Sequence, residues 1–430
     1  MVKTTALKTL VVTCIASAVM QAGGWAKAAG PGTPEKHAAQ PLSERETLTG
    51  DWWGLGDELA EQGITLGLSA TQVYQFNVDG GLATHRHAGR FAGSYDLEGE
   101  FDLERLLNVP GGTFFFLAEG SWSDGLDASS VGSLMGLNDD AAGDRSIDVT
   151  EAWYEQCLAD GRFRLRLGKI DLAGGFECRG CPVSFDGNSC ANDETTQFLA
   201  SPLVNNAAIP FPDNGIGAAA YWEPVDGWYL AAGVADAEAD ARETGFNTAF
   251  SGPERAVSIY ETGAAVDLPC GERRLPGAYR VGFWINHYAE YLDGRGSTRD
   301  VPGLYVSLDQ MVLKENADPE DGQGLGAFFR YARADEEIRE VYRFWSGGFQ
   351  YRGLIAGRDE DVLGFGFAHG RLAPDAGFTA DHETIYEVYY SIRVAPRLAV
   401  SPHVQHVVNP GGDDSVEDAT VVGVRIQASF

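Results

Sequence analysis

The carboxyl-terminal residues alternate between apolar and polar side chains, and this pattern restricts the possible folds more than any other feature. One face carries Val422, Val424, Ile426, Ala428 and Phe430, and the other carries Gly423, Arg425, Gln427 and Ser429. A period of two residues is that of a β-strand, and about ten residues is the length a tilted strand needs to cross the hydrocarbon layer of a membrane. Similar alternation recurs at residues 163–167, 279–286 and 386–394. The pattern predicts an all-β chain.

The amino terminus predicts export. Lys3 and Lys8 precede an apolar run, residues 10–20, and the small-residue pattern Ala26-Lys27-Ala28 follows it. These features are typical of a Sec signal peptide, residues 1–28, rather than a membrane anchor, because the apolar run is too short to span a bilayer. No later run of about eighteen apolar residues occurs, so no transmembrane helix is expected in the mature chain. An exported chain of this kind is secreted, periplasmic or a membrane β-barrel.

The lengths of the connections favour the barrel. Short turns, such as residues 159–161 and 395–397, alternate with long polar connections, such as 124–145 and 174–213. Outer-membrane barrels have short periplasmic turns and long external loops. We therefore expect a transmembrane antiparallel β-barrel of about 16 strands over residues 64–430. A periplasmic segment, residues 29–63, is expected to precede it and to contain a short helix from Trp52 to Gly63, capped by Asp51.

The charge balance excludes one class of partner. The chain has 62 acidic residues against 32 Lys and Arg, and a formal net charge of −30. Nucleic-acid binding needs clustered basic residues, so no nucleic-acid partner is expected. Much of the acidity falls in the long connections that the barrel topology assigns to the outside, for example at residues 139–144, 236–240 and 413–417.

Several motifs resemble one family of porins. The segments Leu48-Thr49-Gly50-Asp51-Trp52-Trp53-Gly54-Leu55, Glu151-Ala152-Trp153-Tyr154-Glu155-Gln156, Leu165-Arg166-Leu167-Gly168-Lys169-Ile170-Asp171 and Pro402-His403-Val404-Gln405-His406 are similar to segments of the carbohydrate-selective (OprB-type) outer-membrane porins. Tyr351-Arg352-Gly353-Leu354, with Arg358 and Asp361, adds to this resemblance. The resemblance covers residues 48–430 and implies a sixteen-stranded outer-membrane barrel that passes small sugars by diffusion, without a cofactor.

The strand phase identifies the side chains expected to line the lumen. Sugars offer hydroxyl groups and apolar ring faces, so a selective channel needs charged or amide groups together with aromatic rings. The candidates for sugar contact are Arg164, Arg166, Arg280, Trp284, Asn286, Arg330, Glu383, Glu387, Arg393, Gln405 and Arg425. The resemblance adds Glu151, Lys169 and Asp171. Simple alternation from Leu167 points Lys169 outward, so a bulge or the end of the strand must intervene if Lys169 faces the lumen.

A cysteine-containing insertion departs from the family pattern. Cys178, Cys181 and Cys190 lie in the longest connection, residues 174–213. In an exported chain a disulfide among them is favoured over a zinc site, which would need a fourth ligand. We expect this connection to fold into the lumen and narrow it.

Other functions remain as alternatives. A general cation-preferring diffusion porin, or a non-channel surface protein such as an adhesin, would also fit an acidic exported barrel. Glycoside hydrolysis is not expected, because Glu383 and Glu387 would lie about 13 Å apart along a strand. The expected partners are small neutral sugars, outer-membrane lipid and the barrel assembly machinery, reached through the strand that ends at Phe430. A homo-oligomer is possible, and the expected location is the outer membrane of a Gram-negative-type bacterium after Sec export.

Overall fold

The computed structural model describes residues 54–430 except 85–87, 173–197, 211–213, 239–254, 271–272 and 317–321. All of these described residues belong to one compact unit, Pro41–Phe430. Among them, no helix has both the length and the apolar character required to cross a membrane.

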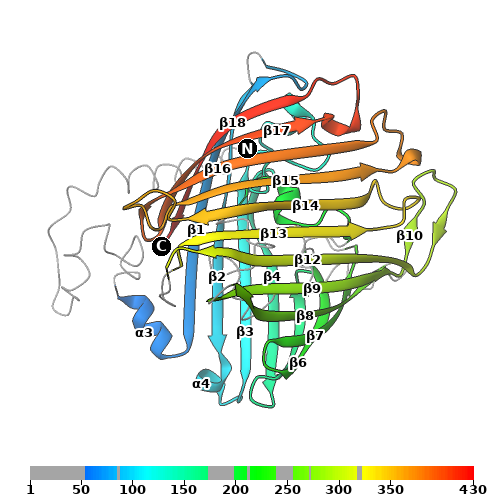
Figure 1. Ribbon diagram of the computed structural model, residues 1–430. Coiled ribbons are helices and arrows are strands. Elements are labelled where there is room, and N and C mark those ends of the chain that lie inside the picture. The colour runs from blue at the N-terminus through cyan, green and yellow to red at the C-terminus, as the bar shows by residue number, and fades with distance from the viewer. Residues whose placement is uncertain are drawn as a thin grey trace. The chain divides into compact units, whose positions relative to one another are not determined.

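Sixteen strands form a closed antiparallel barrel, which confirms the predicted fold (Figure 1). Each strand pairs with its neighbours along the chain, and β1 closes the barrel against β18, with Ser69 opposite Ser429. The barrel strands are β1 (Ile64–Asp79), β2 (Gly89–Asp102), β3 (Gly112–Trp122), β4 (Arg145–Leu158), β5 (Phe163–Ile170), β6 (Gly215–Val225), β7 (Trp228–Asp236), β8 (Ala256–Cys270), β9 (Arg273–Asn286), β12 (Val301–Lys314), β13 (Gly324–Arg333), β14 (Val341–Arg352), β15 (Val362–Leu372), β16 (His382–Ala395), β17 (Leu398–Val408) and β18 (Ala419–Ser429). A small hairpin, β10 (Ala289–Glu290) with β11 (Ser297–Thr298), lies in the connection from β9 to β12.

The alternation in sequence becomes an alternation of side-chain exposure. In β18, Ile426 is 42% exposed whereas Arg425 is 2% exposed. In β9, Val281 and Phe283 are exposed, and Arg280 and Trp284 are buried. Because adjacent residues of a strand point to opposite faces, the apolar residues form the outer face of the barrel and the polar ones point inward.

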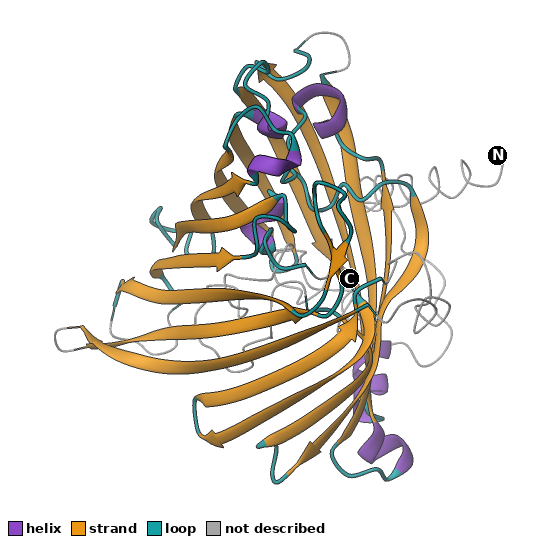
Figure 2. Ribbon diagram, turned by 90° about the vertical axis from the view of Figure 1, so that its right-hand side faces the viewer, coloured by secondary structure: helices purple, strands orange, loops and turns teal. Residues whose placement is uncertain are grey.

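Short helical segments lie at both ends of the strands. Helix α3 (Leu55–Glu61) precedes β1, and α4 (Leu103–Leu107) connects β2 to β3 at the same end (Figure 1). The predicted helix is present but shorter, and the predicted cap at Asp51 is wrong, because Gly54 caps the helix with a left-handed φ of 87°. Further short segments are α5 (Ser201–Val204), η2 (Asp127–Val131), η3 (Pro374–Ala376) and η4 (Pro410–Gly412), in the connections of the opposite end (Figure 2).

Candidate channel lining

Two connections fold inward against the barrel wall. Residues 126–137 come from the β3–β4 connection, and residues 198–204 from the β5–β6 connection. Phe198 is fully buried, and its ring lies 5.6 Å from that of Phe328 and 5.2 Å from that of Tyr389, both inward-facing residues of the wall. These segments therefore occupy the β13–β17 side of the barrel interior.

Small inward-facing residues of β15 make room for these segments. A Cβ atom built on Gly366 would lie 2.8 Å from the Phe198 ring and 3.1 Å from Leu203 Cδ1. A Cβ atom on Gly370 would lie 2.8 Å from the sulfur of Met135. Contacts this close are not tolerated in well-packed interiors, so the two glycines permit both segments to lie against the wall.

Glu383 holds the first inward segment. Its carboxylate accepts hydrogen bonds from Ser133 Oγ at 2.8 Å and from the backbone N–H groups of Leu134 and Met135, both at 2.9 Å. The N–H group of Gly411, in the β17–β18 connection, donates a fourth bond at 2.6 Å. Because Glu383 is fully buried, these donors replace water as the partners of its charge.

Glu387 holds the second inward segment in the same way. It accepts hydrogen bonds from the N–H groups of Leu199 and Ala200, both at 2.8 Å, and from Gln405 Nε2 at 2.9 Å. Glu387 is 1% exposed. Two predicted sugar-contact residues, Glu383 and Glu387, are thus placed where their carboxylates face loop backbone.

Two further predicted residues also bind these segments. Arg330 donates from Nη1 to the carbonyl oxygens of Leu203, at 2.9 Å, and Val204, at 3.2 Å. Gln405 donates to the carbonyl oxygen of Leu137 at 2.9 Å. The polar side chains of β13, β16 and β17 therefore satisfy backbone groups that would otherwise lack partners in the barrel interior.

The other half of the barrel carries polar and aromatic side chains on its inward face, and these are also buried, with Arg166 and Glu261 4% exposed. Arg166 forms a buried ion pair with Glu155, with 3.2 Å between Nη2 and Oε2, and its guanidinium lies 3.8 Å from the centre of the Trp153 ring. The guanidinium of Arg164 lies 4.6 Å from the centre of the Tyr221 ring. Both arginines, predicted to face inward, are brought together with aromatic rings here.

A second group continues this wall over β7–β12. The hydroxyl groups of Tyr229 and Tyr305 donate to the two oxygens of Glu261 at 2.5 and 2.7 Å. Arg280 donates to Ser307 Oγ at 2.8 Å, and its Nη2 lies 3.8 Å from Asp309 Oδ2. The rings of Trp284 and Tyr305 are stacked, with 6.3 Å between their centres. The predicted Arg280 and Trp284 belong to this group.

Several members of this wall were not predicted from the sequence. They occupy inward positions of their strands and are Tyr221, Tyr229, Glu261, Tyr305 and Asp309. The period-two signal could have found Glu261, because the exposed Tyr260 precedes it in β8.

The remaining candidates lie in four different places. Glu151 accepts a hydrogen bond from Trp153 Nε1 at 2.9 Å, next to the Arg166 group. Asn286, at the end of β9, accepts from the Tyr288 N–H and so caps a turn. Arg393 lies near the β16–β17 turn and donates to the carbonyl oxygen of Pro396. Arg425 is buried on the inward face of β18.

Lys169 is 3% exposed, and its Nζ donates to the carbonyl oxygen of Val149 at 2.8 Å. The β3–β4 register shifts beside Val149, where Leu117 pairs with Glu151 and Ala118 with Val149. Lys169 itself stays in register with Ala152 of β4 and Ile216 of β6, and follows Gly168, which has a positive φ of 141°. Lys169 is thus buried with its charge against the backbone of β4, whereas Asp171 is exposed. The cysteines Cys178, Cys181 and Cys190 lie outside the described residues.

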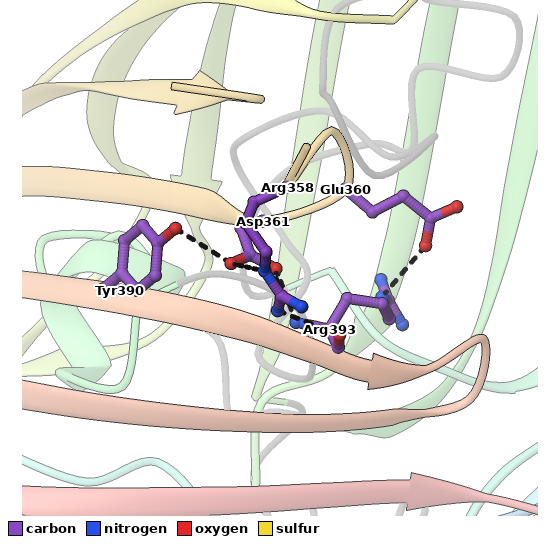
Figure 3. A network of polar contacts seen from close by, with 5 residues as sticks. All are labelled: Arg358, Glu360, Asp361, Tyr390 and Arg393. Atoms are coloured by element: carbon purple, nitrogen blue, oxygen red, sulfur yellow. Dashed lines mark hydrogen bonds and ion pairs between the residues drawn. The ribbon is translucent and has the colours of Figure 1, made fainter. Parts of the chain in front are cut away.

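Asp361 lies in the β14–β15 turn, at the centre of a network of polar contacts (Figure 3). It pairs with Arg358, with 2.6 Å between Oδ1 and Nη2, and accepts bonds from Tyr390 Oη and from the Arg393 N–H. Burial alone would raise the pKa of this carboxyl group, but the hydrogen bonds from Arg358, Arg393 and Tyr390 outweigh it and hold the pKa below its usual value. The network ties the β14–β15 turn to β16.

Asp127, in the inward β3–β4 segment, has a raised pKa. Burial raises the pKa of Asp127 to about 6, against the lowering effect of the hydrogen bond from the Ser133 N–H, and the nearby charge of Glu383 adds to the rise. The protonation of Asp127 is thus coupled to the segment that Glu383 binds.

Comparisons with known proteins agree with this architecture. The family model described as carbohydrate-selective porin, OprB family, matches residues 86–430. Porin B of Pseudomonas aeruginosa is 24% identical over 92% of this chain and 94% of its own length. The high pH structure of Pseudomonas putida OprB has a TM-score of 0.78 at 21% identity, covering 90% of this chain and 99% of that one, and the low pH structure of the same protein has a TM-score of 0.57 at 18% identity with the same coverage. These structures share the fold. The chain belongs to the carbohydrate-selective porin, OprB family.

Proposed function

We propose that this porin is a passive channel for small neutral sugars in the outer membrane, with no energy coupling and no chemical conversion of its substrate. Family membership supports the sugar specificity. The sugar-contact surface is the wall of β4–β12, and the inward segments 126–137 and 198–204 narrow the passage on the opposite side.

The observation that carries this proposal is the pairing of charged groups with aromatic rings on that wall. Arg166 lies over Trp153, and Glu261 binds two tyrosine hydroxyl groups. Rings of this kind can cover the C–H faces of a sugar, while guanidinium and carboxylate groups exchange hydrogen bonds with its hydroxyl groups. A channel for small ions alone would have no use for the rings.

The proposed orientation places the long connections outside the cell, and the start of β1 and the end of β18 in the periplasm, after Sec export directed by residues 1–28. Phe430 continues the last strand, and its N–H donates to the carbonyl oxygen of Leu68 at 2.9 Å. We assign recognition by the assembly machinery to this terminal strand.

Planar-bilayer recording tests the proposal. The full-length protein should form discrete channels whose current falls as neutral sugars of graded size are added. The substitutions W153A and R166Q should weaken this block, whereas L165A, on the outer face of the same hairpin, should not. Channels that sugars do not block, and that select cations over anions, would support the general diffusion porin instead. Absence of channels would refute the proposal.

A further inference from the structure

A row of cations crosses four adjacent strands on the outer face of the barrel. Arg333 of β13 is the register partner of Arg343 in β14, Arg343 is that of Arg371 in β15, and Arg371 is that of His382 in β16. Each of these residues alternates with a buried inward neighbour, for example Ala332, Phe344 and Leu372. The four side chains therefore leave the barrel on the same side and at the same height. Neighbouring strands lie about 4.8 Å apart, so the row is about 14 Å long.

The row has a defined position relative to the apolar belt. One step toward the middle of the strands, Tyr331, Trp345 and His369 form the next register row. The rings of Trp345 and His369 stack with 4.2 Å between their centres. Beyond them, Phe329 and Phe367 belong to the apolar outer face. Aromatic rings mark the level at which the hydrocarbon layer meets the headgroups. The cation row thus lies at headgroup level.

The charges of this row are only partly balanced by the protein. Asp381 pairs with Arg371, with 2.9 Å between Oδ2 and Nη1, and with His382. Arg333 and Arg343 have no carboxylate partner among the described residues, and Arg343 instead lies over the Tyr342 ring at 5.4 Å. Like charges directly opposite each other on paired strands are destabilising. With Asp381 included, the row keeps a net positive charge in a chain whose net charge is −30.

We propose that this row binds the phosphate groups of a phosphorylated glycolipid in the outer leaflet of the membrane. The inference rests on the orientation given in the proposed function, because the row lies at the end of the barrel opposite to the start of β1 and the end of β18. Guanidinium groups bind phosphate through paired, charge-assisted hydrogen bonds, and a membrane lipid is the anion that can approach them from the side of the hydrocarbon layer. The aromatic row then contacts the lipid at the base of its headgroup.

Native mass spectrometry of the detergent-solubilised barrel tests this binding without requiring channel activity. The probe is bis-phosphorylated lipid A, compared with its dephosphorylated form and with phosphatidylglycerol. The triple variant R333Q/R343Q/R371Q is matched by R162Q/R274Q/R397Q, which removes the same charge at the other end of the barrel. We expect the first variant to weaken lipid A binding about 100-fold, if each arginine contributes what a basic residue near an anionic lipid surface contributes.

The outcomes separate the inference from the proposed function. Selective loss of lipid A binding in the row variant, with retention in the matched variant and weak binding of the dephosphorylated form, supports the inference. Equal binding by both variants, or binding of phosphatidylglycerol as tight as that of lipid A, overturns it. The row variant should still form channels in planar bilayers that sugars block. The proposed function is therefore tested by bilayer recording, independently of lipid binding.

Discussion

The substitution E383Q should release the inward β3–β4 segment and widen the channel. Each carboxylate oxygen of Glu383 accepts two hydrogen bonds: Oε1 from Ser133 and Met135, and Oε2 from Leu134 and Gly411. Glutamine keeps one acceptor oxygen and presents an NH₂ group to the other two donors. The substitution therefore removes two bonds and places donors against donors.

The size of the effect follows from this count. Hydrogen bonds to a charged group contribute about 1.5 to 3 kcal/mol each, so losing two costs the docked segment at least about 3 kcal/mol. A free-energy change of that size shifts the equilibrium between docked and undocked segment by about 100-fold or more. The bond from Gln405 to the Leu137 carbonyl and the packing of Met135 on Gly370 remain, so we expect intermittent opening rather than permanent loss of docking.

Single-channel recording measures this opening. E383Q should show added high-conductance intervals and admit larger sugars than the wild type, whereas E417Q, which removes the same charge from an exposed loop position, should behave as the wild type. Deletion of residues 133–136 should abolish the difference between Glu and Gln at position 383, because Glu383 acts through that segment. The heat-dependent gel mobility of the folded barrel should be unchanged. Identical conductance and sugar exclusion in E383Q and E417Q would refute the reasoning.

Three further predictions concern packing and titration. The substitution G366V should displace Phe198, at a cost of about 1 to 3 kcal/mol for overpacking, and raise conductance, whereas the outward A327V should not; unchanged conductance in G366V would contradict this. D361N should lower the free energy of unfolding by about 1 to 2 kcal/mol at pH 7 in urea titrations. The pKa of Asp361 is depressed in the folded state, so ionised Asp361 stabilises the fold above its usual pKa, and this stabilisation is lost as the pH falls through the depressed value. The free energies of unfolding of D361N and the wild type should therefore become equal in acid. With the β3–β4 segment docked, the pKa of Asp127 is raised to about 6. Protonated Asp127 therefore stabilises the docked segment fully below about pH 4, and this stabilisation is lost as the pH rises through 6. The frequency of channel opening should rise over that range in the wild type but not in D127N.

The strand phase was predictable from sequence because the membrane imposes it. A lipid-facing position must be apolar, so Arg280 and Arg425 could be assigned to the inward face from their neighbours alone. The same rule points Lys169 toward lipid, but the structure buries it with Nζ on the Val149 carbonyl oxygen, beside a register shift between β3 and β4. Such a shift depends on pairing with a second strand, which a single stretch of sequence does not contain.

The partners of the inward residues were not predictable from sequence. Glu383 and Ser133 lie 250 positions apart, and the segment that Glu383 binds has no periodic pattern. Strand phase shows that a glutamate points into the barrel, but it does not show whether water, sugar or backbone meets it there. Strand phase therefore predicts the same role for Glu383, Glu387 and Arg166, although only Arg166 lies on the wall for which sugar contact is proposed.

The two halves of the lumen use acidic side chains for different purposes, and the number of donors around each acid explains the difference. Glu383 meets four donors, three of them backbone N–H groups, and Glu387 meets two N–H groups and an amide. Such convergent donors require a group that only accepts, which an ionised carboxylate is and a glutamine is not. Glu261 instead accepts hydrogen bonds from the hydroxyl groups of Tyr229 and Tyr305, which belong to side chains and not to the backbone. Replacing the protein donors by a solute would leave backbone N–H groups unsatisfied at Glu383 and Glu387, so these two acids serve the position of the inward segments, whereas sugar contact is proposed for the wall that contains Glu261.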